Sequence, residues 1–95
     1  MDKPVLKIIK IGGNIINDQK ALKAFLTDFA LIDGMKILVH GGGKRASEIL
    51  TLMGISPKMI NGRRITDDKT LEVVTMVYAG LLNKNIVSRL QALNC

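Results

Sequence analysis

Residues 36–43, KILVHGGG, decide the fold, because they form a short apolar run that ends on three glycines. Residues 5–13, VLKIIKIGG, repeat this design and end on two glycines. β-Branched residues and leucine in so short a run indicate a buried strand. Glycines at the end of a strand leave backbone N–H groups that an anion can approach closely. The carboxyl edge of a parallel sheet, where two such ends meet, is where open α/β proteins bind phosphates and other anions.

Helical periodicity follows each strand and predicts an α/β fold. Apolar residues spaced at i, i+3, i+4 and i+7 predict a helix over residues 18–33, and a second stripe predicts a helix over residues 44–53. Strand, helix, strand and helix in this order form a βαβα unit. We therefore expect the strands over residues 5–11 and 36–40 to be parallel.

The segment after the second helix lacks both periodicities and predicts a β-hairpin. Asn61 and Gly62 stand between two short runs that favour strands, which is a strong hairpin signal. We expect this antiparallel hairpin to project over the edge of the sheet.

A long helix is predicted from the hairpin to about residue 92. Thr66 or Asp67 supplies its amino-terminal cap. Gly80 lies inside it at a cost of about 1 kcal/mol relative to alanine, which a close helix–helix contact would explain. Its apolar stripe is expected to contain Leu71, Val74, Val77, Tyr78, Leu81 and Leu82.

Composition narrows the class of partner. A formal net charge of +6 favours an anionic ligand. The aromatic residues are Phe25, Phe29 and Tyr78 alone, so no stacking platform for nucleic acid is expected. Cys95 is the single cysteine and cannot form a disulfide within the chain, which suits a cytoplasmic location. No apolar run approaches the ~20 residues of a membrane span, so no membrane partner is expected.

Lys10 and the glycines are the candidate site residues. Lys10 lies inside the first apolar run, where a lysine is out of place unless its ammonium reaches an anion or solvent at the strand end. Gly12 and Gly13 alone fit a tight turn as well as a ligand contact. For the triplet that contains Gly42 and Gly43, we favour ligand contact over a simple turn.

The glycine triplet leaves one alternative class of protein open. It is not a Walker A loop, because Arg45 stands where that loop needs Ser or Thr to hold magnesium. Gly41, Gly43 and Ala46 do match the relaxed dinucleotide pattern G-x-G-x-x-A. A nucleotide-binding oxidoreductase module is therefore an alternative, although it explains neither Lys10 nor the hairpin.

Two further polar residues, Arg64 and His40, are compared as possible site residues and as structural residues. Arg64 follows Arg63 after the hairpin turn, and a guanidinium binds a carboxylate through two parallel hydrogen bonds, but spacing alone favours a solvated arginine pair. His40 has no evident Ser, Cys or metal-ligand partner, so we expect it to be a structural hydrogen-bonding residue. No metal site is predicted.

Taken together, four segments resemble the amino-terminal part of the N-acetylglutamate kinases, which are members of the amino-acid kinase family. Their order and spacing along the whole chain make the resemblance specific. It implies a three-layer αβα sandwich with a mainly parallel sheet. The matching segments are residues 9–13 (IKIGG), 39–43 (VHGGG), 61–66 (NGRRIT) and a helix containing Val73, Val74 and residues 79–84 (AGLLNK).

The resemblance also implies a reaction. ATP, with Mg²⁺, would phosphorylate the side-chain carboxylate of N-acetyl-L-glutamate to an acyl phosphate in arginine biosynthesis. The roles that it implies are charge neutralisation on the transferring phosphoryl group by Lys10 as the catalytic residue, phosphate binding by Gly12 and Gly13, and substrate binding by Gly42, Gly43 and Arg64, the last at the α-carboxylate.

Kinases of this type are well over twice as long as this chain. The resemblance therefore implies that residues 1–95 are the acylglutamate-binding part and that the carboxyl-terminal ATP-binding part is absent. We predict that the 95-residue chain does not catalyse by itself. Because residues 1–4 alone precede the first strand, we expect the full-length protein to be a homodimer, with the helix of residues 67–92 as a candidate contact. N-Succinylglutamate kinase and a nucleotide- or amino-acid-binding module without catalysis are the alternatives.

Overall fold

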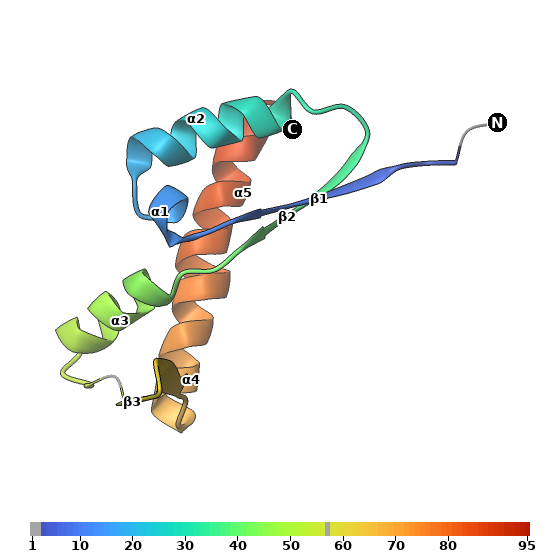
Figure 1. Cartoon of the computed structure of the whole chain (residues 1–95). Coiled ribbons are helices and arrows are strands. Elements are labelled where there is room, and N and C mark those ends of the chain that lie inside the picture. The colour runs from blue at the N-terminus through green and yellow to red at the C-terminus, as the bar shows by residue number, and fades with distance from the viewer. Residues whose placement is uncertain (1–2, 57) are drawn as a thin grey trace.

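Two parallel strands form a sheet, as the two glycine-ended runs predict (Figure 1). A computed structural model describes residues 3–56 and 58–95. Strand β1 (Leu6–Ile11) pairs with β2 (Met35–His40), and the register sets Leu6 opposite Met35 and Ile11 opposite His40. Both strands therefore end at the same edge of the sheet, where each meets its glycines.

Helices follow the strands in the predicted order. One short helix, α1, comes directly after the first glycine pair and is absent from the sequence prediction. The others begin and end within a few residues of their predicted bounds. The helical elements are α1 (Gly13–Ile16), α2 (Gln19–Ala30), α3 (Gly43–Leu52), α4 (Asp68–Thr75), η1 (Met76–Leu82) and α5 (Asn83–Ala92).

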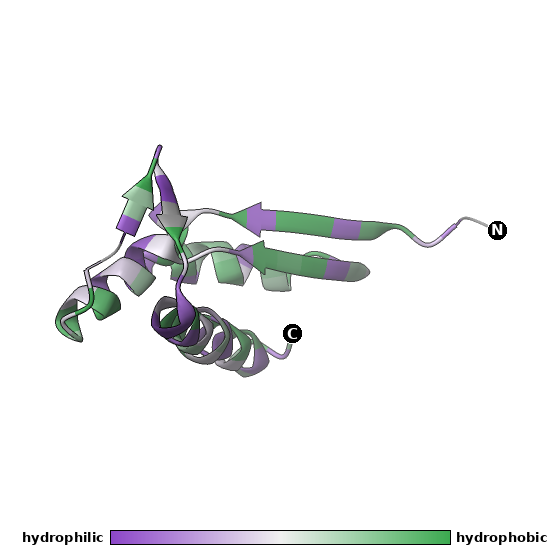
Figure 2. Cartoon of the chain, turned by 90° about the horizontal axis from the view of Figure 1, so that it is seen from below, coloured by the Kyte–Doolittle hydropathy of each residue, from purple (hydrophilic) through white to green (hydrophobic). Residues whose placement is uncertain are grey.

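Helices cover one face of the sheet. Figure 1 shows the strands edge-on with α2 above them, and in Figure 2 the same strands lie in front of α2 with no helix of the described chain in front of them. Side chains alternate accordingly: Ile11 is buried, whereas Leu6 and Ile8 are 48% and 65% exposed. The described residues supply the parallel sheet and one helical layer of the predicted αβα sandwich.

The described residues contain two hydrophobic cores that meet at Leu82. The first core lies between β1, α2 and α5, and the second joins α3 to α4 and η1. Leu82 is half-buried and packs against both cores. The buried members are Ile11, Ile16, Leu22, Leu26 and Ile86 in the first core and Ala46, Leu50, Val73 and Val77 in the second.

The long helix has the predicted extent, but its middle part, η1, is π-helical. A π-helix holds more residues per turn than an α-helix, so residues from η1 onward depart from a regular α-helical pattern. The buried face of α4, which precedes η1, also differs from the predicted one. Leu71 and Leu81, expected inside, are 54% and 45% exposed, and Val73 is buried instead. Within the described residues, Gly80 does not make the close helix–helix contact that would explain it, because a Cβ there would meet no described atom within 4 Å.

The hairpin forms where the sequence predicts it. β3 (Lys58–Ile60) pairs antiparallel with β4 (Arg63–Ile65). Asn61 and Gly62 both have positive φ, at 50° and 76°, as a two-residue type I′ turn requires. Figure 2 shows the hairpin beyond the carboxyl ends of β1 and β2, near α3.

Asp67 caps α4, as predicted. Its carboxylate accepts a hydrogen bond from the Thr70 amide at 2.8 Å. This hydrogen bond favours the charged form and lowers the pKa of Asp67 below its ordinary value of 3.8. Because the folded-state pKa is the lower one, the contribution of the cap to stability is present above the unfolded-state pKa and is lost as the pH falls through the lowered value.

Lys36, on the covered face of β2, ties the sheet to the end of α2. Its ammonium donates hydrogen bonds to the carbonyl oxygens of Phe29 at 2.8 Å, Ala30 at 3.3 Å and Ile32 at 2.6 Å. The same ammonium lies 4.9 Å from the centroid of the Phe29 ring. The last carbonyls of a helix lack partners within it, and the helix dipole attracts a cation to this end. Lys36 therefore supplies a carboxyl-terminal cap from a neighbouring strand.

We predict that Lys36→Met lowers the free energy of unfolding by about 1–2 kcal/mol, because the last carbonyls of α2 lose their charged partner. Chemical denaturation of the chain measures this loss. Lys7→Met is the matched control, since Lys7 stands opposite Lys36 in the register but donates one exposed hydrogen bond, to the carbonyl of Asp33 at 2.9 Å. Equal losses in the two variants would contradict the capping role.

Gly42 is the point at which the second glycine turn touches the long helix. It is buried and has a φ of 154°, a conformation that side chains rarely adopt. A Cβ at this position would overlap the Leu82 side chain and lie 3.5 Å from the Tyr78 ring. The close approach that the sequence suggested at Gly80 therefore occurs here, between the triplet and η1.

We predict that Gly42→Ala destabilises the chain by about 1–3 kcal/mol, because the new methyl group adds backbone strain and displaces Leu82 from both cores. Gly41→Ala is the control: no described atom lies within 4 Å of a Cβ at Gly41, and its φ is not positive. Urea unfolding should separate the two variants clearly. A Gly42→Ala protein as stable as the Gly41→Ala protein would show that the contact with Leu82 is not needed.

Candidate functional site

The two glycine turns lie side by side at the carboxyl edge of the sheet. Ile11 and His40 are opposite each other in the register, so Gly12 and Gly41 leave neighbouring strands at the same level. The sequence predicts this juxtaposition, and the parallel register confirms it. The chain therefore gathers the backbone of both turns at the edge where α/β proteins bind anions.

The first turn opens onto a hollow. The carbonyl oxygen of Gly12 accepts hydrogen bonds from the amides of Ile15 and Ile16, both at 3.2 Å, and so begins α1. No described atom lies within 4 Å of a Cβ at Gly12. A hollow of about 640 Å³ adjoins this turn, and its lining residues are Gly12, Gly13, Asn14, Ile15, Asn17 and Lys44.

The second turn begins α3. Gly42 is its N-cap and Gly43 its first residue. A side chain at position 42 would overlap Leu82, so packing alone is a reason for glycine here. The predicted substrate contact would be a second reason. A Cβ at Gly43 would lie at 3.4 Å from the Tyr78 hydroxyl oxygen. Substrate binding by Gly42 and Gly43 stays a prediction.

His40 makes two hydrogen bonds. Its Nδ1 lies 2.9 Å from the carbonyl oxygen of Gly41, and its Nε2 lies 3.3 Å from Nδ2 of the Asn83 side chain. Because a carbonyl oxygen can only accept, Nδ1 is the donor in the first of these contacts. The ring joins the end of β2 to the start of α5, in agreement with the structural role expected for it.

Lys10 is the last residue of β1 on the open face of the sheet. It stands opposite Val39 in the register and is exposed. Alternation along the strand sets it on the same side as Ile8. Lys10 is thus two residues before Gly12, and its side chain is on the face of the sheet that the helices do not cover. This position suits an anion bound at the sheet edge.

A second hollow, of about 430 Å³, lies between α3, the hairpin and the long helix. Its volume is in the range of small-molecule sites. One of the predicted substrate residues, Gly43, lines it, together with Gly62 of the hairpin turn. The lining residues are Gly43, Lys44, Ser47, Met59, Gly62, Thr66, Val74 and Tyr78.

Arg64, predicted to grip a carboxylate, occupies the centre of β4. Its backbone pairs with Met59, which lines the second hollow. The Arg64 side chain lies outside the described part of the structure. Its substrate contact stays a prediction.

Lys44 is a residue near the site to which the sequence analysis gives no role. It belongs to the walls of both hollows. One feature of the sequence could have drawn attention to Lys44. It directly follows the glycine triplet in the first turn of a helix, where the helix dipole disfavours a cation.

The described residues also bear on metals and membranes. Residues 3–56 and 58–95 contain no group of three or more His, Cys, Asp or Glu side chains placed to hold a metal ion. In the same residues, none of the helices has the length and apolar character that a bilayer crossing requires.

Comparisons with known proteins agree with this arrangement. Residues 6–95 match the model of the amino acid kinase family. An acetylglutamate kinase of Parabacteroides distasonis is 58% identical over 93 residues, which are 98% of this chain and 36% of the relative. An acetylglutamate kinase of Cytophaga hutchinsonii is 60% identical over 90 residues, or 95% of this chain and 34% of the relative. The chain thus spans about a third of the length of these relatives.

Solved structures show the same fold. The structure of smu.665 from Streptococcus mutans superposes with a TM-score of 0.71 at 24% identity, over 94% of this chain and 37% of that protein. N-acetylglutamate synthase from Neisseria gonorrhoeae, complexed with coenzyme A and L-arginine, gives a TM-score of 0.64 at 22% identity, over 92% of this chain and 20% of that protein. With its strand–glycine pair, its hairpin and the match over residues 6–95, the chain belongs to the amino acid kinase family.

Proposed function

We propose that this chain is the acylglutamate-binding part of a kinase that transfers the γ-phosphoryl group of ATP to the side-chain carboxylate of N-acetyl-L-glutamate. The product is an acyl phosphate, an intermediate of arginine biosynthesis. The observation that carries the proposal is the register that sets both glycine turns at one edge beside Lys10. Identity of 58% to an acetylglutamate kinase along nearly the whole chain supports it. ATP would bind mainly to a carboxyl-terminal part that this chain does not contain.

The proposed reaction needs positioning and charge stabilisation more than a covalent nucleophile on the protein. The substrate carboxylate is ionised near neutral pH and is itself the nucleophile. Its oxygen forms a bond to the γ-phosphorus while the bond from that phosphorus to the β–γ bridging oxygen breaks, and ADP leaves with the bonding electrons. Mg²⁺ enters with ATP as part of the substrate.

Each predicted residue has one task in this scheme. Lys10 neutralises negative charge on the transferring phosphoryl group, and the amides of the Gly12–Gly13 turn hold its oxygens. The amides of Gly42 and Gly43 hold the acylglutamate. Arg64 binds its α-carboxylate through a two-pronged hydrogen bond.

The assembly and location of the whole protein are part of the proposal. We place the enzyme in the cytoplasm, where the single cysteine, Cys95, would stay reduced. We expect a homodimer that uses the long helix of α4, η1 and α5, because its exposed apolar residues include Leu71, Met76 and Leu81. No nucleic acid or membrane partner is expected.

A second acyl substrate is open to the same site. N-Succinylglutamate carries the same two glutamate carboxylates and differs in its acyl group alone, so the glycine turns and Arg64 would serve it equally. Membership of the amino acid kinase family removes the main support for the oxidoreductase alternative. A binding module without catalysis is the remaining competitor, and activity decides it.

The first test joins this chain to the carboxyl-terminal two-thirds of the Parabacteroides distasonis relative; we call this protein the chimera. We expect the chimera to form an acyl phosphate from ATP and N-acetylglutamate, trapped as a hydroxamate with hydroxylamine, and the 95-residue chain alone to form none. Lys10→Met in the chimera should lower kcat/KM by about 10²–10³-fold, because charge on the phosphoryl group loses a neutralising cation.

Lys7→Met is the control for that substitution, since Lys7 lies on the same strand but alternates to the covered face. Its kcat/KM should stay within about twofold of the chimera, as expected for a surface change away from the site. A folded chimera without activity on either N-acetylglutamate or N-succinylglutamate would refute the kinase proposal and favour the binding module. Equal effects of the two substitutions would refute the role of Lys10.

A further inference from the structure

We propose that Lys44 is a further substrate-binding residue, whose ammonium holds an oxyanion of the bound substrates between the two glycine turns. The inference rests on the proposed function and deepens it. Lys44 directly follows the glycine triplet, is the second residue of α3 and is exposed. Its place between two hollows, together with its unpaired charge, points to this role.

Lys44 is shared by the walls of neighbouring hollows. It lines the hollow of about 640 Å³ beside Gly12 and Gly13 and the hollow of about 430 Å³ beside Gly43 and the hairpin. If the first turn holds the phosphoryl donor and the second holds the acyl acceptor, the two substrates meet across the start of α3. A lysine in both walls stands at that meeting point.

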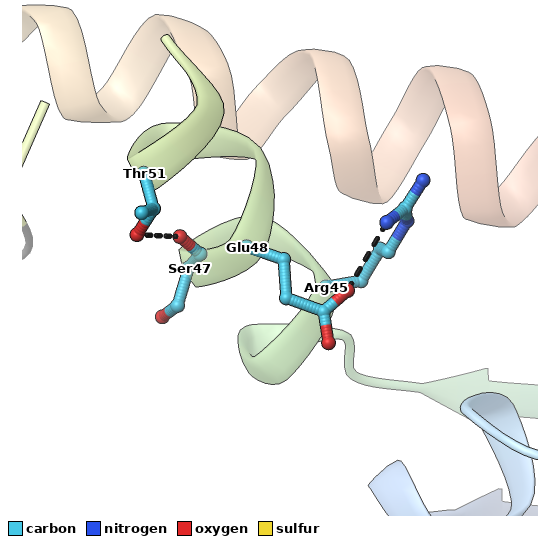
Figure 3. A network of polar contacts seen from close by, with 4 residues as sticks. All are labelled: Arg45, Ser47, Glu48 and Thr51. Atoms are coloured by element: carbon cyan, nitrogen blue, oxygen red, sulfur yellow. Dashed lines mark hydrogen bonds and ion pairs between the residues drawn. The ribbon is translucent and has the colours of Figure 1, made fainter. Parts of the chain in front are cut away.

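The charge of Lys44 is available to a ligand. Glu48 lies four residues later, at the spacing of a helical ion pair, but its carboxylate binds Arg45 at 3.0 Å (Figure 3). In the described part of the chain, Lys44 has no acidic partner, and α3 has no acidic residue in its first turn. The helix dipole opposes a cation there, and a bound anion would offset this cost.

The ligand chemistry is an oxyanion, which has two sources among the proposed substrates. One is the transferring phosphoryl group, which approaches from the side of the first turn. The other is a carboxylate on the acyl group, which N-succinylglutamate has and N-acetylglutamate lacks. Either one accepts a charge-assisted hydrogen bond from a lysine.

The binding test uses the chimera and its Lys44→Gln variant, with pyrophosphate and N-succinylglutamate as probes in isothermal titration calorimetry. We expect the substitution to weaken binding of at least one probe by about tenfold or more, the loss typical of a hydrogen bond to a charged group. Lys44→Arg should retain most of the affinity. Lys23→Gln, an equal loss of charge on the exposed side of α2, is the control and should bind both probes like the chimera. Unchanged affinity of Lys44→Gln for both probes would overturn the inference.

Steady-state kinetics then identify the source of the oxyanion. A loss of kcat/KM for Lys44→Gln that is about equal with the acetyl and succinyl substrates assigns the phosphoryl group. A loss confined to the succinyl substrate, in its KM, assigns the acyl carboxylate. A folded chimera that turns over neither substrate would defeat the proposed function, whereas the calorimetric comparison still decides the role of Lys44.

Discussion

The contact between Gly42 and Leu82 is the constraint on which the rest of the structure depends. Leu82 belongs to the margins of both cores, and the glycine lets the second turn approach it without a side chain in between. The position of the turn relative to the long helix is therefore set by packing. The register of β1 and β2 then fixes the position of the first glycine turn relative to the second. A small apolar contact thus fixes the geometry of a polar site.

The long helix, made of α4, η1 and α5, contributes side chains to both hydrophobic cores. Its α4 and η1 parts pack against α3, and its α5 part packs against the core under the sheet. Arg89 in α5 also donates to Gln19 at 2.6 Å, and Asn83 holds His40. The same helix therefore packs against α3, which begins at the second glycine turn, and against the end of the sheet, where the first glycine turn begins. This arrangement explains how two cores without a broad shared boundary keep the two turns aligned.

The sequence predicts the regular parts of this architecture and part of the site. Apolar runs, helical periodicity and Asn61-Gly62 locate the strands, the helices and the hairpin, because each signal is local. The π-helical part η1 contains Leu82, which packs against both cores, and the exposure of Leu81 within it cannot be derived from an α-helical period. Gly42 and Gly80 show the same limit. Which glycine makes the close contact depends on which element arrives opposite it.

The site divides along the same line. The juxtaposition of the glycine turns follows from strand order, and so it could be predicted. The place of Lys44 between two hollows depends on how α3 sits against the hairpin and α1, which no spacing in the sequence encodes. Lys36 is a similar case, because its hydrogen bonds to the end of α2 follow from the tertiary position of the helix. Long side chains at the starts of helices and strands are therefore where local patterns carry the least information.

The open face of the sheet has a thermodynamic consequence. Leu6, Ile8, Met35, Ile37 and Val39 stay in contact with water in the folded chain. Unfolding therefore exposes less new apolar surface than in a globular domain of equal length. The heat-capacity change of unfolding should fall below the usual ~12–15 cal/mol/K per residue, and the denaturant slope should be correspondingly shallow. The stability curve of the isolated chain is then flatter with temperature, with a weak maximum in place of a pronounced one.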